Sequence, residues 1–201
     1  MSNEIIDISR FSPSDADTFL FDCNVLMYVF YTFGGYKDNT MSSYKKLFNT
    51  LAPKENCIYF PAVLISEFCN TFIRNEYRRY LRQNNLNATT FNFKQSYRPT
   101  TEYKDTINEI SDIVNHQLLA LPSAIVCNDG FDSLNICRLF NNENQFDFND
   151  RYYGELSKLK NCYIVTHDKD FKFIDGISII TNCNALLNSQ ALSPSTQGSL
   201  T

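Results

Sequence analysis

The stretch Thr18-Phe19-Leu20-Phe21-Asp22-Cys23-Asn24-Val25-Leu26 decides how the chain is interpreted. An apolar run ends abruptly on the carboxylate of Asp22, and the apolar residues after it recur at the spacing of a buried helix. A strand that ends on an acidic residue and turns at once into a helix is typical of an open α/β sheet, in which ligands bind beyond the carboxyl ends of the strands. Taken alone, the stretch is more simply interpreted as a helix cap, because Asp is a favoured N-cap residue.

The composition favours a folded, soluble protein with one domain. The chain has 201 residues, of which 43% are hydrophobic and 20% charged, enough to build a sizeable core. No basic segment followed by an apolar core and a cleavage site opens the chain. Its longest apolar stretch, Phe19 to Phe33, carries Asp22 and Asn24 and is too short to span a bilayer. We therefore expect a cytoplasmic protein without a membrane partner.

Cysteine usage and net charge indicate which kinds of site the protein can contain. The seven cysteines are odd in number and never form a Cys-x-x-Cys pair, which argues against a disulfide framework and a zinc site and fits a reducing compartment. The net charge of −4 argues against a protein that coats nucleic acid through bulk charge. It does not exclude a nucleic-acid enzyme whose acidic residues gather around a cation.

Apolar periodicity predicts strands that alternate with helices along the whole chain. Strands are predicted at 18–21, 57–60, 123–127, 162–166 and 177–181, and helices at about 24–33, 41–51, 62–81, 102–119, 131–140 and 146–160, with a last turn at 185–187. This alternation predicts an α/β fold with a central, mainly parallel sheet of about five strands and helices on both faces. No glycine-rich dinucleotide or Walker A motif follows a strand, so those nucleotide sites are not favoured.

The domain boundaries follow from the same pattern. We expect one domain over residues 1–187, whose first 16 residues form a loosely held, polar lead-in. The polar, Asn- and Thr-rich residues from 84 to 101 are predicted to be an insertion or a mobile loop, and the insertion as a whole spans about 76–104. Residues 188–201 are predicted to be a disordered tail.

Four carboxylates are candidates for one site. Asp22 and Asp168 each stand just past a predicted strand, and a parallel sheet places both at the same edge. Glu67, on the helix after the second strand, and Asp150, at a helix start, can reach that edge. Two like charges about 4 Å apart repel by about 4 kcal/mol at an effective dielectric near 20, so such a cluster requires a cation or bound protons. Oxygen ligands without His or Cys favour Mg²⁺ or Mn²⁺ over zinc.

Four ordered segments together carry a resemblance to a known family. They are Phe19-Leu-Phe-Asp22-Cys-Asn24, Pro61-Ala-Val-Leu-Ile-Ser-Glu67, Asn149-Asp150 and Ile164-Val-Thr166-His-Asp168-Lys-Asp170-Phe171. The set resembles the PIN-domain ribonucleases, most closely the toxin halves of bacterial VapBC-type toxin–antitoxin modules. It covers the core from residue 18 to 187 and leaves the middle insertion unmatched. The resemblance implies a PIN-like three-layer sandwich and a metal-dependent endoribonuclease that hydrolyses RNA phosphodiester bonds.

The resemblance also implies roles for individual residues. The four acids of the metal site are Asp22, Glu67, Asp150 and Asp168, and they would bind Mg²⁺ or Mn²⁺. The supporting residues are Thr166 beside the last acid, Asn24 two positions after the first acid, and Asp170, for which we predict a lesser role. Asp147 is a rival to Asp150, which we prefer because the apolar spacing of a helix begins after it. The implied partners are an RNA substrate, an antitoxin protein and a second copy of the chain.

An acidic site needs positive groups along the path of its RNA. Arg74, Arg78 and Arg82 recur at i, i+4 spacing on the predicted helix that carries Glu67, and Arg98 lies in the insertion. The interleaved aromatic residues are expected to stack on unpaired bases: Tyr77, Tyr80, Phe91, Phe93 and Tyr97. The alternative is an ordinary solvated helix face.

Two other functions stay open. A phosphohydrolase of similar topology would use Asp22 as a covalent nucleophile, but such enzymes usually carry a second Asp two residues on, where this chain has Asn24. The other alternative is a catalytically silent PIN-like module that binds RNA or a protein partner.

Overall fold

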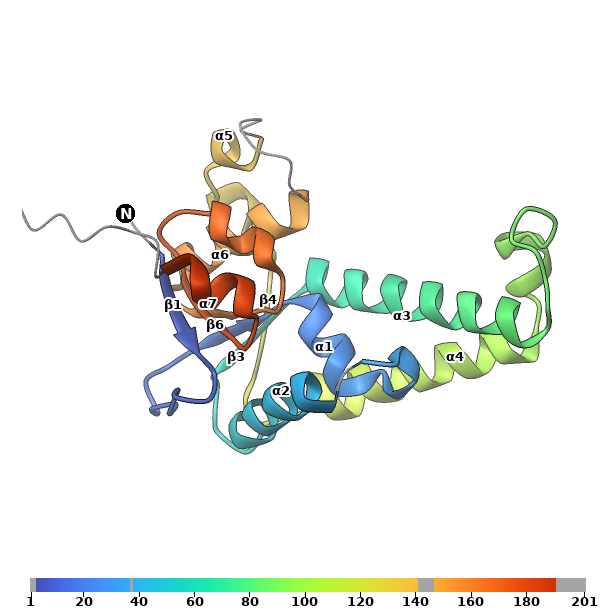
Figure 1. Cartoon of the computed structure of the whole chain (residues 1–201), viewed down its shortest axis with the longest axis horizontal. Coiled ribbons are helices and arrows are strands. Elements are labelled where there is room, and N and C mark those ends of the chain that lie inside the picture. Colours follow the sequence, from blue (N-terminus) through green and yellow to red (C-terminus); the bar gives the residue numbers. More distant parts are fainter. Residues whose placement is uncertain (1–2, 37, 141–146, 191–201) are drawn as a thin grey trace, which may run out of the picture.

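The computed structural model describes residues 3–36, 38–140 and 147–190. Its strands form one six-stranded sheet in the order β1-β6-β5-β2-β3-β4, and every pairing is parallel (Figure 1). The strands are β1 (Glu4–Asp7), β2 (Phe19–Phe21), β3 (Ile58–Pro61), β4 (Ala124–Cys127), β5 (Tyr163–Val165) and β6 (Ser178–Thr181). The predicted α/β class is confirmed, and the arrangement is consistent with a PIN-like three-layer sandwich.

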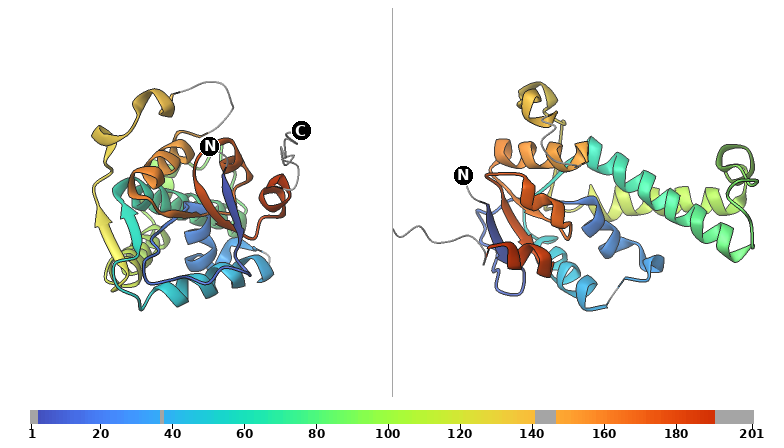
Figure 2. Two further views of the ribbon diagram at one scale, coloured as in Figure 1. Left: turned by 90° about the vertical axis from the view of Figure 1, so that its left-hand side faces the viewer. Right: turned by 45° about the horizontal axis from the view of Figure 1, so that its top comes forward.

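Helices flank the sheet on both faces. They are α1 (Cys23–Phe30), α2 (Asp38–Leu51), α3 (Ala62–Gln83), α4 (Thr101–Asp112), α5 (Ile136–Leu139), α6 (Phe148–Lys160) and α7 (Asn184–Gln190). Because parallel strands are joined by right-handed crossovers, connections that run in opposite directions along the sheet place their helices on opposite faces. In Figure 2, α1 and α2 accordingly lie on one side of the strands and α6 on the other.

The central strand explains why the opening stretch is so apolar. The three residues of β2 are completely buried, because the strand lies between β5 and β3 and is covered on both faces. A strand covered on both faces has no solvent side, so its sequence is continuously hydrophobic rather than alternating. These residues belong to one large cluster that forms the core of the sheet.

The strand order reverses next to β2. From β2 the chain proceeds to β3 and β4 on one side, and then returns to the other side for β5 and β6. This reversal lies between β2 and β5, whose carboxyl ends are therefore adjacent: the backbone N–H of Asp22 donates to the Val165 carbonyl at 2.9 Å. A crevice beyond such a reversal is the usual place for ligands in an open parallel sheet. Asp22 and the segment after β5 both lie there.

The beginning of the chain corrects one prediction. Residues 4–7 are not a loose lead-in but the edge strand β1, paired in parallel with β6 so that Ile5 lies opposite Ile179. Ile5 and Ile8 are both buried. This strand was missed because its short apolar run gains its partner from the other end of the chain. The sheet therefore has six strands instead of about five.

Two further boundaries differ from the prediction. The predicted helix at 131–140 is a 3₁₀ turn (Phe131–Ser133) followed by the single turn of α5, whose start is capped by the Asn135 side chain. The last helix, α7, continues through residue 190, so residues 188–190 are helical and not part of a tail. The rest of the predicted tail, 191–201, and the predicted loop at 141–145 lie outside the described residues.

The outer parts of α3 and α4, with the residues that join them, project away from the sheet as an antiparallel pair (Figure 1). We call residues 74–112 the arm. Residues 84–101, predicted to be an insertion or a mobile loop, contain regular structure at the tip of the arm: a π-helix (Phe93–Tyr97) is capped by Asn92, and Thr100 caps α4. At its centre lies Tyr97, only 1% exposed and outside the main core cluster. The arm therefore has a small core of its own.

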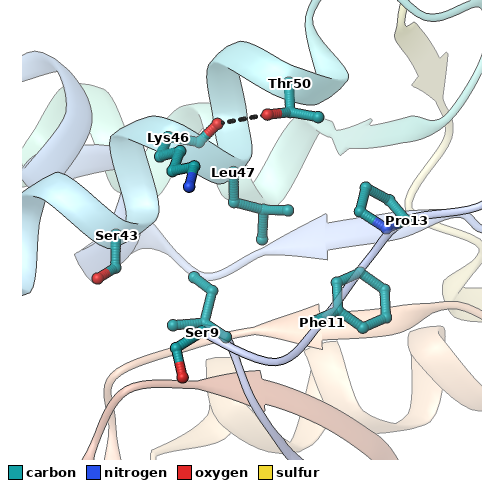
Figure 3. A pocket seen from close by; sticks show the side chains of 8 residues that line it. Ser9, Phe11, Pro13, Ser43, Lys46, Leu47 and Thr50 are labelled. Atoms are coloured by element: carbon teal, nitrogen blue, oxygen red, sulfur yellow. Dashed lines mark hydrogen bonds between the residues drawn. The ribbon is translucent and has the colours of Figure 1, made fainter.

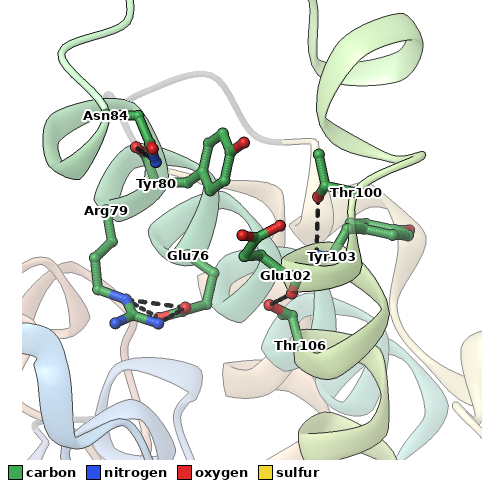
Figure 4. Close-up of polar contacts among 8 residues, drawn as sticks. All are labelled: Glu76, Arg79, Tyr80, Asn84, Thr100, Glu102, Tyr103 and Thr106. Atoms are coloured by element: carbon green, nitrogen blue, oxygen red, sulfur yellow. Dashed lines mark hydrogen bonds and ion pairs between the residues drawn. The ribbon is translucent and has the colours of Figure 1, made fainter.

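A buried ion pair joins the arm to the body of the protein. Glu76 is 5% exposed and accepts hydrogen bonds from the Arg79 guanidinium three residues away (Figure 4). The same guanidinium lies 4.3 Å from the centre of the Phe33 ring, in the segment after α1. The Tyr31 hydroxyl also hydrogen-bonds to Glu76. Arg79 is thus occupied in fixing the base of the arm.

Candidate active site

Asp22 is held at the carboxyl end of β2 by a residue from β5's end. It occupies the N-cap position of α1, but its side chain makes no capping hydrogen bond; instead, Thr166 Oγ1 donates to its Oδ2 at 2.7 Å. Only 5% of Asp22 is exposed. Burial raises its pKa to about 7, the hydrogen bond from Thr166 opposes this shift, and the charges of Glu67 and Asp168 add to it. A simple helix cap does not explain this environment.

The same threonine positions the acid after β5. The backbone N–H of Asp168 donates to Thr166 Oγ1 at 2.9 Å, so one hydroxyl links the two aspartates. Asp168 Oδ1 in turn accepts from the backbone N–H of Asp170 at 2.9 Å and caps the 3₁₀ segment that follows (Lys169–Phe173). Asp170 thus supports Asp168 through its backbone.

The structure separates the two candidate acids at the start of α6. The helix begins at Phe148, and Asp147 is its exposed N-cap residue, which accepts from the backbone N–H of Asn149 at 2.9 Å. Asp150 lies within the first turn and is half-buried. Burial raises the pKa of Asp150 to about 8, and the charges of Asp22 and Asp168 contribute to the shift. Asp150 is therefore the more buried of the two acids, and its charge interactions reach Asp22 and Asp168. Asp147 is exposed, but its charge still raises the pKa values of Asp150 and Glu67.

Glu67 contacts α6 directly. It lies on the second turn of α3, half-buried, and its Oε2 accepts a hydrogen bond from the Tyr153 hydroxyl. Burial raises the pKa of Glu67, and hydrogen bonds from Tyr153 and Asn149 oppose that shift. Burial and the charge of Glu67 raise the pKa of Tyr153, so the phenol stays a hydrogen-bond donor. The sequence indicated Tyr153 only as an apolar position of the helix, because its partner lies on another helix.

A second group of polar contacts joins the ends of β5 and β6 behind the aspartates. The buried Tyr44 hydroxyl on α2 donates to the Thr166 carbonyl at 3.0 Å and accepts from the Asn182 backbone N–H at 3.1 Å. His167 Nδ1 lies 2.9 Å from Asn182 Oδ1. The backbone N–H of His167 donates to Asn24 Oδ1 at 3.4 Å. Sequence reasoning could not find Tyr44, since nothing in α2 marks it as a neighbour of β5.

The four acids fit a hard divalent cation in charge and in donor chemistry. All are carboxylates, and burial together with their mutual repulsion favours either protons or a cation at this edge. Among residues 3–36, 38–140 and 147–190, however, no three His, Cys, Asp or Glu side chains form a group that could hold one ion. Mg²⁺ does not need such a group, because it keeps several waters and commonly binds through only one or two carboxylates and the substrate phosphate.

The arginines named from the sequence and the aromatic residues between them have different environments. Arg74, Arg78 and Arg82 are exposed along α3, and Arg98 is exposed with its guanidinium 5.3 Å from the centre of the Phe93 ring. The aromatic rings pack on one another: the Tyr97 ring centre lies 5.1 Å from that of Tyr77 and 5.2 Å from that of Tyr80. Stacking of Tyr97 on an RNA base is excluded by its burial, so the prediction is wrong for Tyr97. For the other four rings, which are half-buried, it stays a prediction.

A separate pocket of about 240 Å³ lies between α2 and the loop after β1 (Figure 3). Phe11, Leu47 and Lys46 are among the residues that line it, together with the polar side chains of Ser43 and Thr50. None of the four acids lines this pocket. It is not part of the carboxylate edge.

No protein-family model matches the chain, and no curated protein matches it. In the part of the chain that the structure describes, no helix is both long enough and apolar enough to cross a membrane.

Proposed function

We propose that this protein is a metal-dependent endoribonuclease that hydrolyses RNA phosphodiester bonds at the carboxylate edge, defined as Asp22, Glu67, Asp150 and Asp168. One observation carries the proposal: acids from four separate segments interact at the reversal of the strand order, where the pKa values of Asp22 and Asp150 are raised to about 7 and 8. Perturbed titratable groups are typical of functional sites, and a reversal of strand order is where ligands usually bind in an open parallel sheet. The sequence resemblance to PIN-domain ribonucleases supports the choice of reaction.

The residues of the carboxylate edge would have different roles. Asp22 and Asp168, the two acids that Thr166 links, would hold Mg²⁺ or Mn²⁺ together with water and the substrate phosphate, and Asp150 and Glu67 would lie beside the cation. When bound, the cation supplies Lewis-acid polarisation of the phosphoryl oxygen and of water. Thr166 orients both Asp22 and Asp168 through its hydroxyl, so a change at one of them is transmitted to the other.

The chain also provides a proton acceptor. In hydrolysis the water oxygen bonds to phosphorus while the bond from phosphorus to the leaving oxygen breaks, and one proton must leave the water as another reaches the leaving oxygen. A carboxylate with a pKa near the working pH is suited to accept the first of these protons. Asp150, whose pKa is raised to about 8, is the best candidate for this role.

The test is RNA cleavage by the purified protein with Mg²⁺, with Mn²⁺ and with EDTA. We expect cleavage with either metal, none with EDTA, and loss of activity in Asp22→Asn, which keeps the size of the side chain but removes its charge. Asp132→Asn, an exposed acid on the 3₁₀ turn after β4, is the matched control and should cleave normally. Wild-type cleavage by Asp22→Asn, or equal cleavage in EDTA, would refute the proposal.

A second candidate function is a silent module that binds RNA without cutting it. The observation that favours it is the absence, among the described residues, of three side chains arranged to hold an ion. Calorimetric titration with Mn²⁺ separates the two functions, since only the nuclease requires binding that Asp22→Asn abolishes. A phosphohydrolase is less well supported, because the proposed nucleophile Asp22 is 5% exposed and hydrogen-bonded to Thr166.

The proposed partners rest on the resemblance alone, and the proposed location rests on the composition and cysteine usage of the sequence. We propose a cytoplasmic protein that forms a homodimer and is inhibited by an antitoxin protein that covers the carboxylate edge. Sedimentation at micromolar concentration tests the dimer, and a purely monomeric protein would contradict it.

A further inference from the structure

The exposed surface of α3 is one narrow line of polar side chains. Successive exposed positions at four-residue spacing are occupied by Ser66, Asn70, Arg74, Arg78 and Arg82, which we call the α3 ridge. Except for the exposed Gln83 at the end of the helix, the residues on either side of these positions are buried or half-buried. The ridge thus contains three cations and no acid, and at 1.5 Å per residue its arginines span about 12 Å.

The ridge begins at the carboxylate edge. Glu67 directly follows Ser66, and the charge of Arg74 is close enough to lower the pKa of Glu67. Arg78 donates to the Asn75 side chain at 3.3 Å, and within the described ranges neither it nor Arg74 or Arg82 forms an ion pair with a carboxylate. Three exposed guanidinium groups therefore lead away from the site without a negative partner.

The other helix of the arm has the opposite charge. On α4, four exposed acids recur at intervals of three and four residues, and Lys104 is the one exposed cation of that helix: the acids are Glu102, Asp105, Glu109 and Asp112. A polyanion that lies against the α3 ridge is attracted, whereas the same polyanion on the α4 side is repelled. The two helices together define on which side of the arm a nucleic acid can lie.

We propose that the α3 ridge binds the backbone of a single RNA strand that extends from the carboxylate edge, and that it does so independently of base sequence. This inference rests on the proposed nuclease function for the identity of the polymer. A single line of cations matches one strand, because a duplex presents two phosphate backbones and the acidic α4 would repel the second. The ridge carries guanidinium groups and small polar side chains and no aromatic ring, so it contacts phosphates, which position a nucleic acid without specifying its sequence.

The proposal predicts that binding and cleavage depend on the length of the RNA. Along α3, Arg78 lies about 16 Å and Arg82 about 22 Å from Glu67. A stacked strand advances about 3.4 Å per phosphate and an extended strand roughly twice that. A dinucleotide cut at the edge cannot reach these arginines, whereas a strand of 12 nucleotides reaches both.

The experiment compares Arg78→Gln/Arg82→Gln with Lys46→Gln/Lys104→Gln, which removes the same charge from exposed positions on α2 and α4. Both are made in the Asp22→Asn background, and binding of labelled 12-nucleotide poly(U) and poly(A) is followed by fluorescence anisotropy over a range of salt concentrations. We expect the ridge variant to bind both RNAs roughly tenfold more weakly and to lose about 1.4 from the log–log salt slope, about 0.7 for each phosphate contact. The control should bind like its parent.

The same two double variants, made without the Asp22→Asn substitution, are assayed for RNA cleavage. The ridge variant should lose kcat/KM on the 12-mer and keep it on a dinucleotide. If the wild type cleaves neither RNA, the proposed function fails, but the anisotropy result still decides the ridge. The ridge proposal is overturned by unchanged affinity and slope, by an equal loss in the control, by preference for duplex RNA of the same length, or by a loss limited to one base sequence. Dissociation of a dimer in the ridge variant, seen by sedimentation, would assign the ridge to a second copy of the chain and overturn it as well.

Discussion

The carboxylate edge and the arm satisfy their buried polar groups in different ways. At the edge, acids from separate segments face one another, and burial with mutual repulsion raises the pKa values of Asp22 and Asp150. In the arm, the buried Glu76 is paired with Arg79 only three residues away. The charge of Glu76 is thus balanced by a residue of the arm itself, whereas the charges of the edge require a proton or a cation from outside. This difference indicates chemistry at the edge and positioning of the substrate along the arm.

The largest effect should come from the edge itself. Asp168→Asn should reduce cleavage roughly a thousand-fold, as expected for losing several kcal/mol of stabilisation at a metal site. Asp170→Asn should change the rate only slightly, because Asp170 supports Asp168 through its backbone N–H, which the substitution keeps. The measurement is kcat at saturating Mg²⁺ in folded protein. Similar losses in the two variants would mean that the roles of these aspartates are not separate.

The arm should be separable in stability from the sheet. Tyr97→Ala removes a large side chain that is 1% exposed, a change that typically costs about 3 kcal/mol or more. Because Tyr97 lies outside the main core cluster, hydrogen exchange should accelerate at the tip, and exchange in β2 and β5 should remain slow. Leu86→Ala, at an exposed position of the tip, is the control. Equal acceleration throughout the protein would show that arm and sheet unfold together.

A smaller effect is expected from a substitution of Tyr153, which contacts the carboxylate edge through Glu67. Tyr153→Phe removes the hydroxyl that hydrogen-bonds to Glu67 and keeps the ring. Groups that orient metal ligands typically contribute 10–100-fold to metal affinity, so Mn²⁺ binding by calorimetry should weaken roughly tenfold. Tyr152→Phe removes a neighbouring phenol that donates to the Asp129 carbonyl and should leave Mn²⁺ binding unchanged. If both variants bind Mn²⁺ like the wild type, Glu67 does not depend on Tyr153 for its orientation.

The smallest expected effect is a pH dependence of stability. The pKa of Asp22 is raised from its ordinary value of 3.8 to about 7, so the folded protein holds this proton more tightly than the unfolded chain. The stabilisation is fully present below the ordinary pKa and is lost as the pH rises through about 7. In EDTA, the Tm of the wild type should therefore fall by a few degrees relative to that of Asp22→Asn between pH 5 and pH 8. Mn²⁺ at pH 8 should restore it, and a rise of Tm with pH in EDTA would contradict the assigned environment.

The sequence alone was sufficient to predict those features that depend on residues close together along the chain. The apolar run before Asp22 identified a strand covered on both faces, and alternation with helices identified a parallel sheet. In such a sheet the ends of the strands meet at one edge, so the positions of Asp22 and Asp168 followed without knowledge of side-chain contacts. The preference for Asp150 over Asp147 also came from helix periodicity and stays a prediction, since α6 begins at Phe148 and Asp147 caps it.

Only the tertiary structure decided which distant groups meet. β1 was not predicted from the sequence because its partner β6 lies more than 170 residues away. The contact between the Tyr153 hydroxyl and Glu67 could not be predicted either, because the two residues lie on different helices. Tyr97 was expected to stack on RNA, yet it is buried against Tyr77 and Tyr80, since burying rings against one another is favourable once two helices bring them together. Periodicity in a sequence specifies which side of an element is apolar. It does not specify what covers that side, because the covering group is fixed by packing between segments far apart in the chain.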